Sequence, residues 1–297
     1  MCEPVELIVN TFERTVDRVL APGMFPRIAE QNQRSFSRRT VVINNVRDPA
    51  AARRRAELLL AAGEIDVYHL VEEHRAEALA MAGVTPRELG RIAYYSDFAW
   101  VGLHRAECPW VLFWDADVEL TSPVNWVDPS IALLARDPRV LVASPSWRPP
   151  TAAAEAIETT ADFHLGYGFS DQLFLAPTAP FRQPIYSEHC WASLRYPTSH
   201  IAATFEQRVD AHMRRRDRLR GTFRHAEYVH PVGSGSAYRP IGWRETLRRR
   251  RNRAIVRWLR RFPPHDPRLR VSGSGLNPSL AGDPSGAPQQ REESSRS

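Results

Sequence analysis

The chain has 297 residues, of which 43% are hydrophobic and 25% charged, a composition that allows one large globular domain with a sizeable core. Its three cysteines are scattered and odd in number, which excludes a disulfide framework and a cysteine-based zinc site and suits a cytoplasmic location. No apolar run is long enough to span a bilayer, and the chain enters an expected strand at Val5 without a secretory signal.

The formal net charge is +6 and every basic side chain other than histidine is arginine, but the excess positive charge is confined to one segment. Nine arginines and a single glutamate lie in residues 241–263. The segment after it is balanced in charge, and residues 1–240 are slightly acidic. A fold that wraps around nucleic acid needs basic surface over its whole binding face, so nucleic acid is not the expected partner.

The first 145 residues alternate between apolar runs and segments with helical spacing, which predicts a doubly wound α/β sheet. In these first 145 residues, strands are expected at 5–10, 39–45, 65–70, 110–115 and 140–144, and a helix at 49–62. After residue 145, the pattern predicts strands at 169–175 and 222–230 and a helix at 199–216.

Three further segments have a clear sequence signal: two are expected to form helices and one is expected to be disordered. Thr85-Pro86-Arg87-Glu88 has the cap, first-turn proline and third-position glutamate of a helix start, and the helix is expected to run, with a break, towards Trp110. Residues 241–262 are expected to form one arginine-rich helix. Residues 264–297 are rich in Pro, Gly and Ser and contain no aromatic residue, so we expect a disordered tail.

The most informative stretch is the run from Trp110 to Leu120, in which five apolar residues lead into Asp115-Ala-Asp117. A short apolar run of this kind indicates a strand buried on both faces, and ligands of open α/β sheets gather at the carboxyl ends of such strands. Two carboxylates one residue apart at that edge are suited to Mn²⁺ or Mg²⁺. The alternative is a solvated turn in which an aspartate caps the backbone.

Several stretches, taken in order, resemble the GT-A glycosyltransferases, most closely the family 2 group. They are residues 7–14, 40–45, 110–120, 205–214 and 228–236. The resemblance implies a GT-A domain over residues 1–240, a Rossmann-like mixed sheet, followed by the basic helix at 241–263 and the tail at 264–297. It also implies a metal-dependent transfer of a sugar from a nucleoside-diphosphate sugar to an acceptor hydroxyl, with inversion.

The resemblance assigns roles to individual residues. The metal would be held by the DxD pair Asp115 and Asp117 with His230, which precedes a Gly/Ser loop able to offer amides to phosphate. The nucleotide sugar would lie against Thr11, Glu13, Asn45, Asp97 and Asp115.

The catalytic base is expected to be Glu206, but family 2 members usually carry Glu-Asp where this chain has Glu206-Gln207. Asp171, Glu188 and Asp210 therefore remain alternatives. Glu206 could instead be a surface residue paired with an arginine, and His230 an ordinary strand-end histidine. Trp147 and Trp191 could stack on a sugar ring or simply pack in the core or at its rim.

The arginine-rich helix allows two interpretations. Its apolar positions could form the membrane-facing side of an interfacial helix, with the arginines attracted to anionic lipid. In that case the protein would contact the inner face of the membrane peripherally, and a lipid-linked or other saccharide acceptor would be natural. The alternative is a helix packed on the domain with solvated arginines. Contact with RNA is a third interpretation with less support. The apolar positions are Trp243, Leu247, Ile255, Trp258, Leu259 and Phe262.

Two other functions compete with sugar transfer. One is nucleotidyl transfer onto a sugar phosphate, but such enzymes open with a glycine-rich loop, and the turn at residues 10–14 contains no glycine. The other is a catalytically degenerate protein that uses the arginine helix as a tether to membrane or RNA. A pure tether has no use for a carboxylate pair at a strand end.

Overall fold

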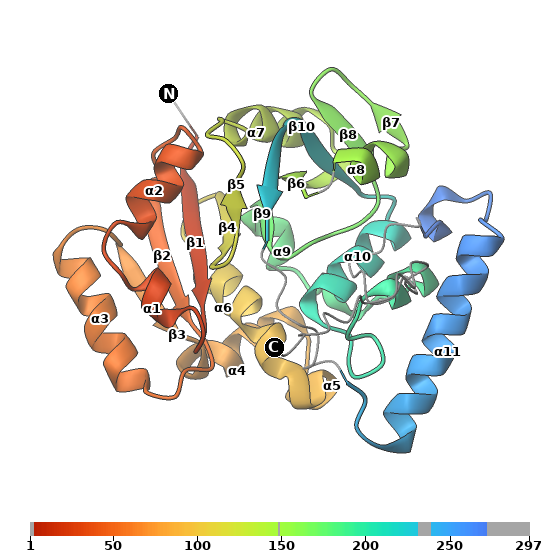
Figure 1. Cartoon of the computed structure of the whole chain (residues 1–297), viewed down its shortest axis with the longest axis horizontal. Helices are drawn as coiled ribbons and strands as arrows, with labels where there is room; N and C mark the ends of the chain where they lie inside the picture. The colour runs from red at the N-terminus through yellow and green to blue at the C-terminus, as the bar shows by residue number, and fades with distance from the viewer. Residues whose placement is uncertain (1–2, 148, 231–238, 272–297) are drawn as a thin grey trace, which may run out of the picture.

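The computed structural model describes residues 3–147, 149–230 and 239–271. Its centre is a ten-stranded mixed sheet in the order β3-β2-β1-β4-β9-β6-β10-β8-β7, with β5 paired to β10 (Figure 1). The strands are β1 (Val5–Thr11), β2 (Arg38–Ile43), β3 (Val67–Leu70), β4 (Trp110–Asp115), β5 (Glu119–Leu120), β6 (Val140–Ser146), β7 (Glu158–Thr159), β8 (Phe163–Gly166), β9 (Leu173–Pro177) and β10 (Leu219–Val229).

The sheet has a parallel half and a mixed half. The strands β1, β2, β3 and β4 are parallel, β9 runs antiparallel to β4 and β6, and β10 is parallel to β6 but antiparallel to β8. The prediction of a doubly wound α/β sheet is therefore confirmed, with its mixed character arising after residue 145.

Helices cover both faces of this sheet because its central strands are apolar on both faces. Successive residues of a strand point to opposite faces, so Val9 and Trp114 join one core while Ile8 and Phe113 join the other. The helices are α1 (Val16–Val19), α2 (Met24–Gln31), α3 (Pro49–Ala61), α4 (Val71–Ala82), α5 (Pro86–Leu89), α6 (Asp97–Arg105), α7 (Val127–Arg136), α8 (Pro149–Glu155), α9 (Thr178–Phe181), α10 (Phe205–Arg215) and α11 (Gly242–Arg261).

The expected helix start at Thr85 is confirmed. Thr85 Oγ1 accepts from the Glu88 amide at 3.4 Å, and the Glu88 carboxylate accepts from the Thr85 amide at 2.8 Å. The helix then breaks into a 3₁₀ segment, Gly90–Tyr95, before α6 carries the chain to β4.

Several element boundaries differ from those expected. Helix α4 was not predicted, and the helix expected at 199–216 begins only at Phe205, because α11 holds the preceding loop. Arg248 donates to the carbonyls of His200 and Ile201, and Asn252 donates to that of Ser199.

Helix α11 lies at the edge of the molecule opposite α3 (Figure 1). It packs on the 3₁₀ segment η3 (Trp191–Arg195), and its Glu245 forms a 3.0 Å ion pair with Arg91. Residues 264–271, expected in a disordered tail, belong to the described fold, since Arg214 on α10 donates to backbone carbonyls there. The remainder of that tail, residues 272–297, lies outside the described residues. No helix of the described residues is long and apolar enough to cross a bilayer.

Candidate functional site

The centre of the site is the end of β4, at the carboxyl edge of the parallel half of the sheet. Asp115 lies opposite Asn10 of β1, and its amide donates to the Gln172 carbonyl at 2.8 Å. Its Oδ1 accepts from the Ala116 amide at 2.8 Å, and its carbonyl accepts from the Val118 amide. These bonds close a tight turn that carries Asp117 just beyond the edge.

His230 reaches this turn from the other half of the sheet. Strand β10 pairs with β5, directly after the turn, so the end of β10 comes to lie beside Asp115. The His230 Nε2 is 3.6 Å from Asp115 Oδ2. Burial alone would lower the pKa of His230, but the nearby carboxylate of Asp115 and the charges of Asp117 and Asp171 outweigh it and raise the pKa. The imidazole thus lies in a cluster whose other members are acids.

The charge of Asp115 acts on two neighbouring acids of the cluster. Burial and the charge of Asp115 raise the pKa of Asp117. Burial and the same charge raise the pKa of Asp171, just before β9, to about 7. Negative charge therefore exceeds positive charge here, which is the electrostatic condition for holding a cation.

Glu206 joins the cluster from α10. It lies in the first turn of that helix, whose start is fixed by a 2.9 Å hydrogen bond from the Phe205 amide to Ser96 Oγ. Burial raises the pKa of Glu206 well above its ordinary value, and the charge of Asp171 raises it further, against an opposing effect of Arg195. A carboxylate of this kind is a stronger base than an exposed one. The structure thus brings Glu206, Asp171, Asp115, Asp117 and His230 together.

The donor set of the cluster fits a hard divalent cation that takes part of its coordination from substrate. Among the described residues, no group of three or more His, Cys, Asp and Glu side chains is placed so that it could hold a metal ion by itself. Mg²⁺ and similar ions are commonly held by one or two carboxylates together with substrate phosphates. Asp115 and Asp117, with His230 beside them, match that arrangement, and the imidazole nitrogen favours Mn²⁺ over Mg²⁺.

The expected nucleotide residues divide into two kinds. Glu13 and Asn45 lie side by side at the ends of β1 and β2, where the Glu13 amide donates to the Asn45 carbonyl at 3.3 Å. Glu13 also accepts from the Arg47 amide, and Asn45 is exposed with a positive φ of 49°. Thr11, in contrast, is completely buried and bonded to Thr15 Oγ1 at 3.2 Å, so it shapes the turn.

Asp97 does not offer a surface to a nucleotide, so this part of the site prediction is corrected. Its side chain is completely buried at the start of α6 and accepts from Arg75 Nε at 2.8 Å. Burial raises the pKa of Asp97 to about 6 despite that arginine. The pair ties α4 to α6, a contact that only the tertiary structure reveals.

The structure also removes two of the alternative bases. Asp210 is completely buried between Arg214 at 2.9 Å and Arg195 at 3.7 Å, and it accepts from Ser193 Oγ at 2.6 Å. Glu188 is paired with Arg216 at 2.6 Å and faces His212 at 3.3 Å, on the surface of α10. Both carboxylates are committed to ion pairs, which leaves Glu206 and Asp171.

We expect Asp210→Asn to lower the free energy of unfolding by about 3 kcal/mol, because Arg195 and Arg214 would keep buried charges without a carboxylate. Urea denaturation of the two proteins measures this difference. An unchanged midpoint would contradict the structural role and return Asp210 to the candidate bases.

Two groups near the cluster were missed by sequence reasoning. Arg14 and Arg18, in and after the first turn, lie near enough to Asp117 for their charges to lower its pKa. Tyr228 donates to Gln172 Oε1 at 3.2 Å and closes the site from β10. No spacing in the sequence relates these segments, since strand order alone brings them together.

The remaining expectations concern aromatic residues and a loop. Trp191 is 60% exposed at the start of η3, while Trp147 is partly buried against the core. The Gly/Ser loop that follows His230 begins at residue 231 and lies outside the described residues.

The structure is remotely similar to solved structures of glycosyltransferases. One is the crystal structure of GalNAc-T7 with UDP, GalNAc and Mn²⁺, with 10% identity and a TM-score of 0.45 over 77% of this chain and 44% of that one. Another is glucosyl-3-phosphoglycerate synthase from Mycobacterium tuberculosis in complex with Mn²⁺, uridine-diphosphate-glucose and phosphoglyceric acid, with 15% identity and a TM-score of 0.34 over 60% of this chain and 57% of that one. The chain spans about half the length of these structures. No protein-family model matches the sequence, and no curated protein matches it.

Proposed function

We propose that the protein is a metal-dependent GT-A glycosyltransferase, which moves a sugar from a nucleoside-diphosphate sugar to an acceptor hydroxyl. The observation that carries this proposal is the meeting of four carboxylates and a histidine from separate segments at one edge of the sheet. Asp115 and Asp117 follow β4, Asp171 precedes β9, Glu206 begins α10 and His230 follows β10. Ligands of open α/β sheets bind at this edge.

The metal ligands would be Asp115 and Asp117, with His230 completing the protein's share. Mn²⁺ or Mg²⁺ bound there would neutralise the charge of the departing nucleoside diphosphate. The charges of Arg14 and Arg18 act on Asp117, and Arg14 would add positive charge for the phosphates, whereas Arg18 is already paired with Glu119 at 2.6 Å. Glu13 and Asn45, at the neighbouring strand ends, would contact the nucleoside.

Glu206 would act as the general base and take the proton from the acceptor hydroxyl. Its raised pKa makes it a strong proton acceptor in a partly buried site, and Asp171 beside it opposes loss of the proton. The hydroxyl oxygen then attacks the anomeric carbon as that carbon gains oxocarbenium character. Attack from the face opposite the diphosphate gives inversion.

A panel of UDP-, GDP- and dTDP-sugars tests the proposal. When no acceptor is present, a glycosyltransferase of this kind slowly transfers the sugar to water, and this hydrolysis releases nucleoside diphosphate. We expect release from one donor class with Mn²⁺ and none after chelation of the metal. No release from any donor, with the folded protein and Mn²⁺ present, would count against the reaction.

Nucleotidyl transfer has less support because the first turn cannot cradle a triphosphate. The Phe12 amide donates to Thr15 Oγ1 at 3.0 Å, and the Glu13 amide donates to the Asn45 carbonyl. A phosphate-binding loop needs such amides pointing at the ligand. A non-catalytic protein that α11 only tethers to membrane or RNA also has less support, since such a protein would not need the acidic cluster.

We also propose that the outer side of α11 contacts anionic membrane at the cytoplasmic face. The expected apolar face is divided in the structure: Ile255 and Leu259 pack inward against η3. The outward positions are Trp243, Leu247, Trp258 and Phe262, each 54–70% exposed, with arginines between them. Interfacial helices combine exposed aromatic residues with cations in this way, and anionic lipid attracts each cation by about 1 kcal/mol.

We expect the double substitution Trp243→Ala/Trp258→Ala to weaken binding to vesicles containing phosphatidylserine by about tenfold or more, since two exposed aromatic side chains that would enter the membrane are lost. Vesicle sedimentation measures the change. Trp191→Ala is the control, because Trp191 is equally exposed but lies outside α11. Equal binding by all three proteins, or no binding by the wild type, would contradict the membrane contact.

A further inference from the structure

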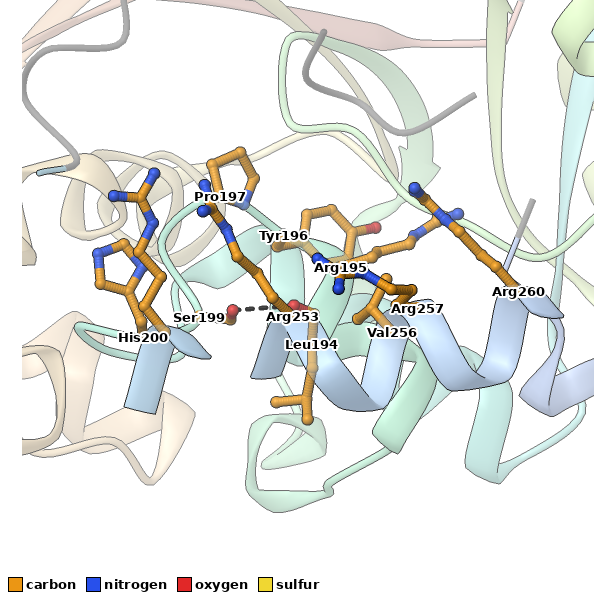
Figure 2. A pocket seen from close by; sticks show the side chains of 11 residues that line it. Leu194, Arg195, Tyr196, Pro197, Ser199, His200, Arg253, Val256, Arg257 and Arg260 are labelled. Atoms are coloured by element: carbon orange, nitrogen blue, oxygen red, sulfur yellow. Dashed lines mark hydrogen bonds between the residues drawn. The ribbon is translucent and has the colours of Figure 1, made fainter. Parts of the chain in front are cut away.

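A cavity of about 250 Å³ lies between α11 and the segment of residues 194–200. Its lining contains five arginines and one histidine but no aspartate or glutamate: Arg195, Arg249, Arg253, Arg257, Arg260 and His200. Figure 2 shows Arg260 of α11 extending towards the side of the cavity where Arg195 lies, whereas Arg253 extends to the side of Pro197. A concave site lined by positive charge of this density favours the binding of an anion.

Two arginines of the cavity are repelled by their neighbours, whereas Tyr196, Asp210 and Glu155 outweigh burial at Arg195 and raise its pKa. Burial and the charge of Arg195 lower the pKa of Arg260, and burial and the charge of Arg253 lower that of Arg249. Within the part of the chain that the structure describes, Arg260 Nε is buried without a hydrogen-bond partner. Glu155 is the acid that acts on both Arg195 and Arg260, from outside the lining. A bound anion would remove this repulsion and use the unpaired donor.

Spacing along α11 separates this arginine face from the outward apolar side. Arg249, Arg253, Arg257 and Arg260 recur at intervals of four, four and three residues, which places them on one side of a helix. The cavity is therefore a feature of one face of α11 and not a consequence of general basicity.

Arg195 links the cavity electrostatically to the proposed catalytic base Glu206, which is itself not part of the lining. Arg195, at its floor, is 4% exposed and 3.7 Å from Asp210, which lies one helical turn after Glu206 on the same side of α10. The charge of Arg195 acts directly on Glu206 and lowers its pKa against burial. Gly168, with φ +126°, makes room for this arginine, because a Cβ there would lie 2.6 Å from Arg195 Nη2.

We propose that this cavity binds a phosphate group of the acceptor, so that the acceptor hydroxyl is presented to Glu206. The proposal rests on the proposed glycosyltransferase function and names the class of its acceptor: a hydroxyl compound that carries a compact phosphate. Guanidinium groups bind phosphate oxygens in pairs, and three or more converging arginines discriminate a phosphate from a neutral sugar. The same chemistry serves a soluble phosphate ester and a lipid phosphate headgroup.

Calorimetric titration of the full chain with inorganic phosphate, in the presence of a metal chelator, tests the site without the donor. We expect saturable binding, weakened about tenfold or more in Arg253→Gln/Arg257→Gln, because each arginine supplies charge-assisted hydrogen bonds. The control is Arg250→Gln/Arg261→Gln, which removes the same charge from the same helix outside the cavity. Equal weakening in both double variants, or no saturable binding by the wild type, would overturn the proposal.

Two further arms identify the source of the phosphate and separate this proposal from the general function. Glycerol phosphate that displaces phosphate supports a soluble acceptor, and displacement only by vesicles of phosphatidic acid supports a lipid one. Failure of both would overturn the acceptor assignment. Mn²⁺-dependent binding of nucleoside diphosphate should be unchanged in Arg253→Gln/Arg257→Gln. If the wild type binds phosphate but no nucleotide, the proposed function fails while the anion site remains.

Discussion

Asp117→Ala is expected to abolish Mn²⁺-dependent binding of the nucleoside diphosphate and to leave the fold intact. Asp115 and Asp117 are the two carboxylates at the turn after β4, so the substitution removes one of the two proposed carboxylate ligands of the metal. We expect the affinity to fall about 100-fold or more, the range in which loss of metal-site partners acts. Calorimetric titration with nucleotide and Mn²⁺ measures the loss.

The stability of this variant provides an internal check. Burial and the charge of Asp115 raise the pKa of Asp117, so its ionised carboxylate opposes folding at neutral pH. Removing it should leave the melting temperature unchanged or higher. Asp162→Ala, at an exposed position paired with His225, is the matched control and should bind nucleotide normally. Retained Mn²⁺-dependent binding in Asp117→Ala would contradict the metal assignment.

Glu206→Gln is expected to lower kcat about 100-fold or more and at the same time to raise the melting temperature. The amide cannot accept the proton of the acceptor hydroxyl, and general-base catalysis is commonly worth that factor. The stabilisation follows from the raised pKa of the buried carboxyl. Stopped-assay kinetics and a thermal melt of the same preparation measure the two effects.

The sign of the pH dependence follows from the direction of the shift. Glu206 has a folded-state pKa above its unfolded value near 4.5, so the native state binds more protons than the unfolded state between the two. Stability therefore falls as pH rises through this interval. The gain in melting temperature from Glu206→Gln should be largest above the folded-state pKa, at about 2 °C or more, and should vanish below about pH 4.5. Wild-type activity should rise with pH over the same interval, as the base ionises.

A Glu206→Gln protein that keeps wild-type kcat would return the role of base to Asp171. A variant that is less stable than the wild type at neutral pH would contradict the buried, charged environment itself. Asp210→Asn gives the contrasting case on the same helix, since there the carboxylate is paired and its loss destabilises.

Local sequence signals predicted the elements that depend on local physics. The apolar run before Asp115 predicted a buried central strand, and Thr85-Pro86-Arg87-Glu88 predicted a helix start with both cap hydrogen bonds. The long arginine-rich helix was predicted to within a residue at each end. Each depends on neighbours in the chain, which is why a single sequence sufficed.

Contacts between distant segments could not be predicted. The burial of Asp97 depends on Arg75 from α4, a helix that the sequence did not reveal because its apolar residues follow no clear stripe. The loop at residues 199–204 has helix-compatible composition, yet α11 binds its carbonyls and keeps it open. The arginines of α11 were recognised as a basic helix, but the cavity arises only because the segment of residues 194–200 packs beside them.

The melting temperature of the purified protein with UDP, GDP and dTDP, each with and without Mn²⁺, tests the central claim most directly. A ligand that binds only the folded state raises the melting temperature by mass action. The account predicts a shift with one of the three nucleotides that requires Mn²⁺ and is absent from Asp117→Ala. A melting temperature that none of the nucleotides changes, with or without Mn²⁺, would contradict a nucleotide-sugar site at the end of β4.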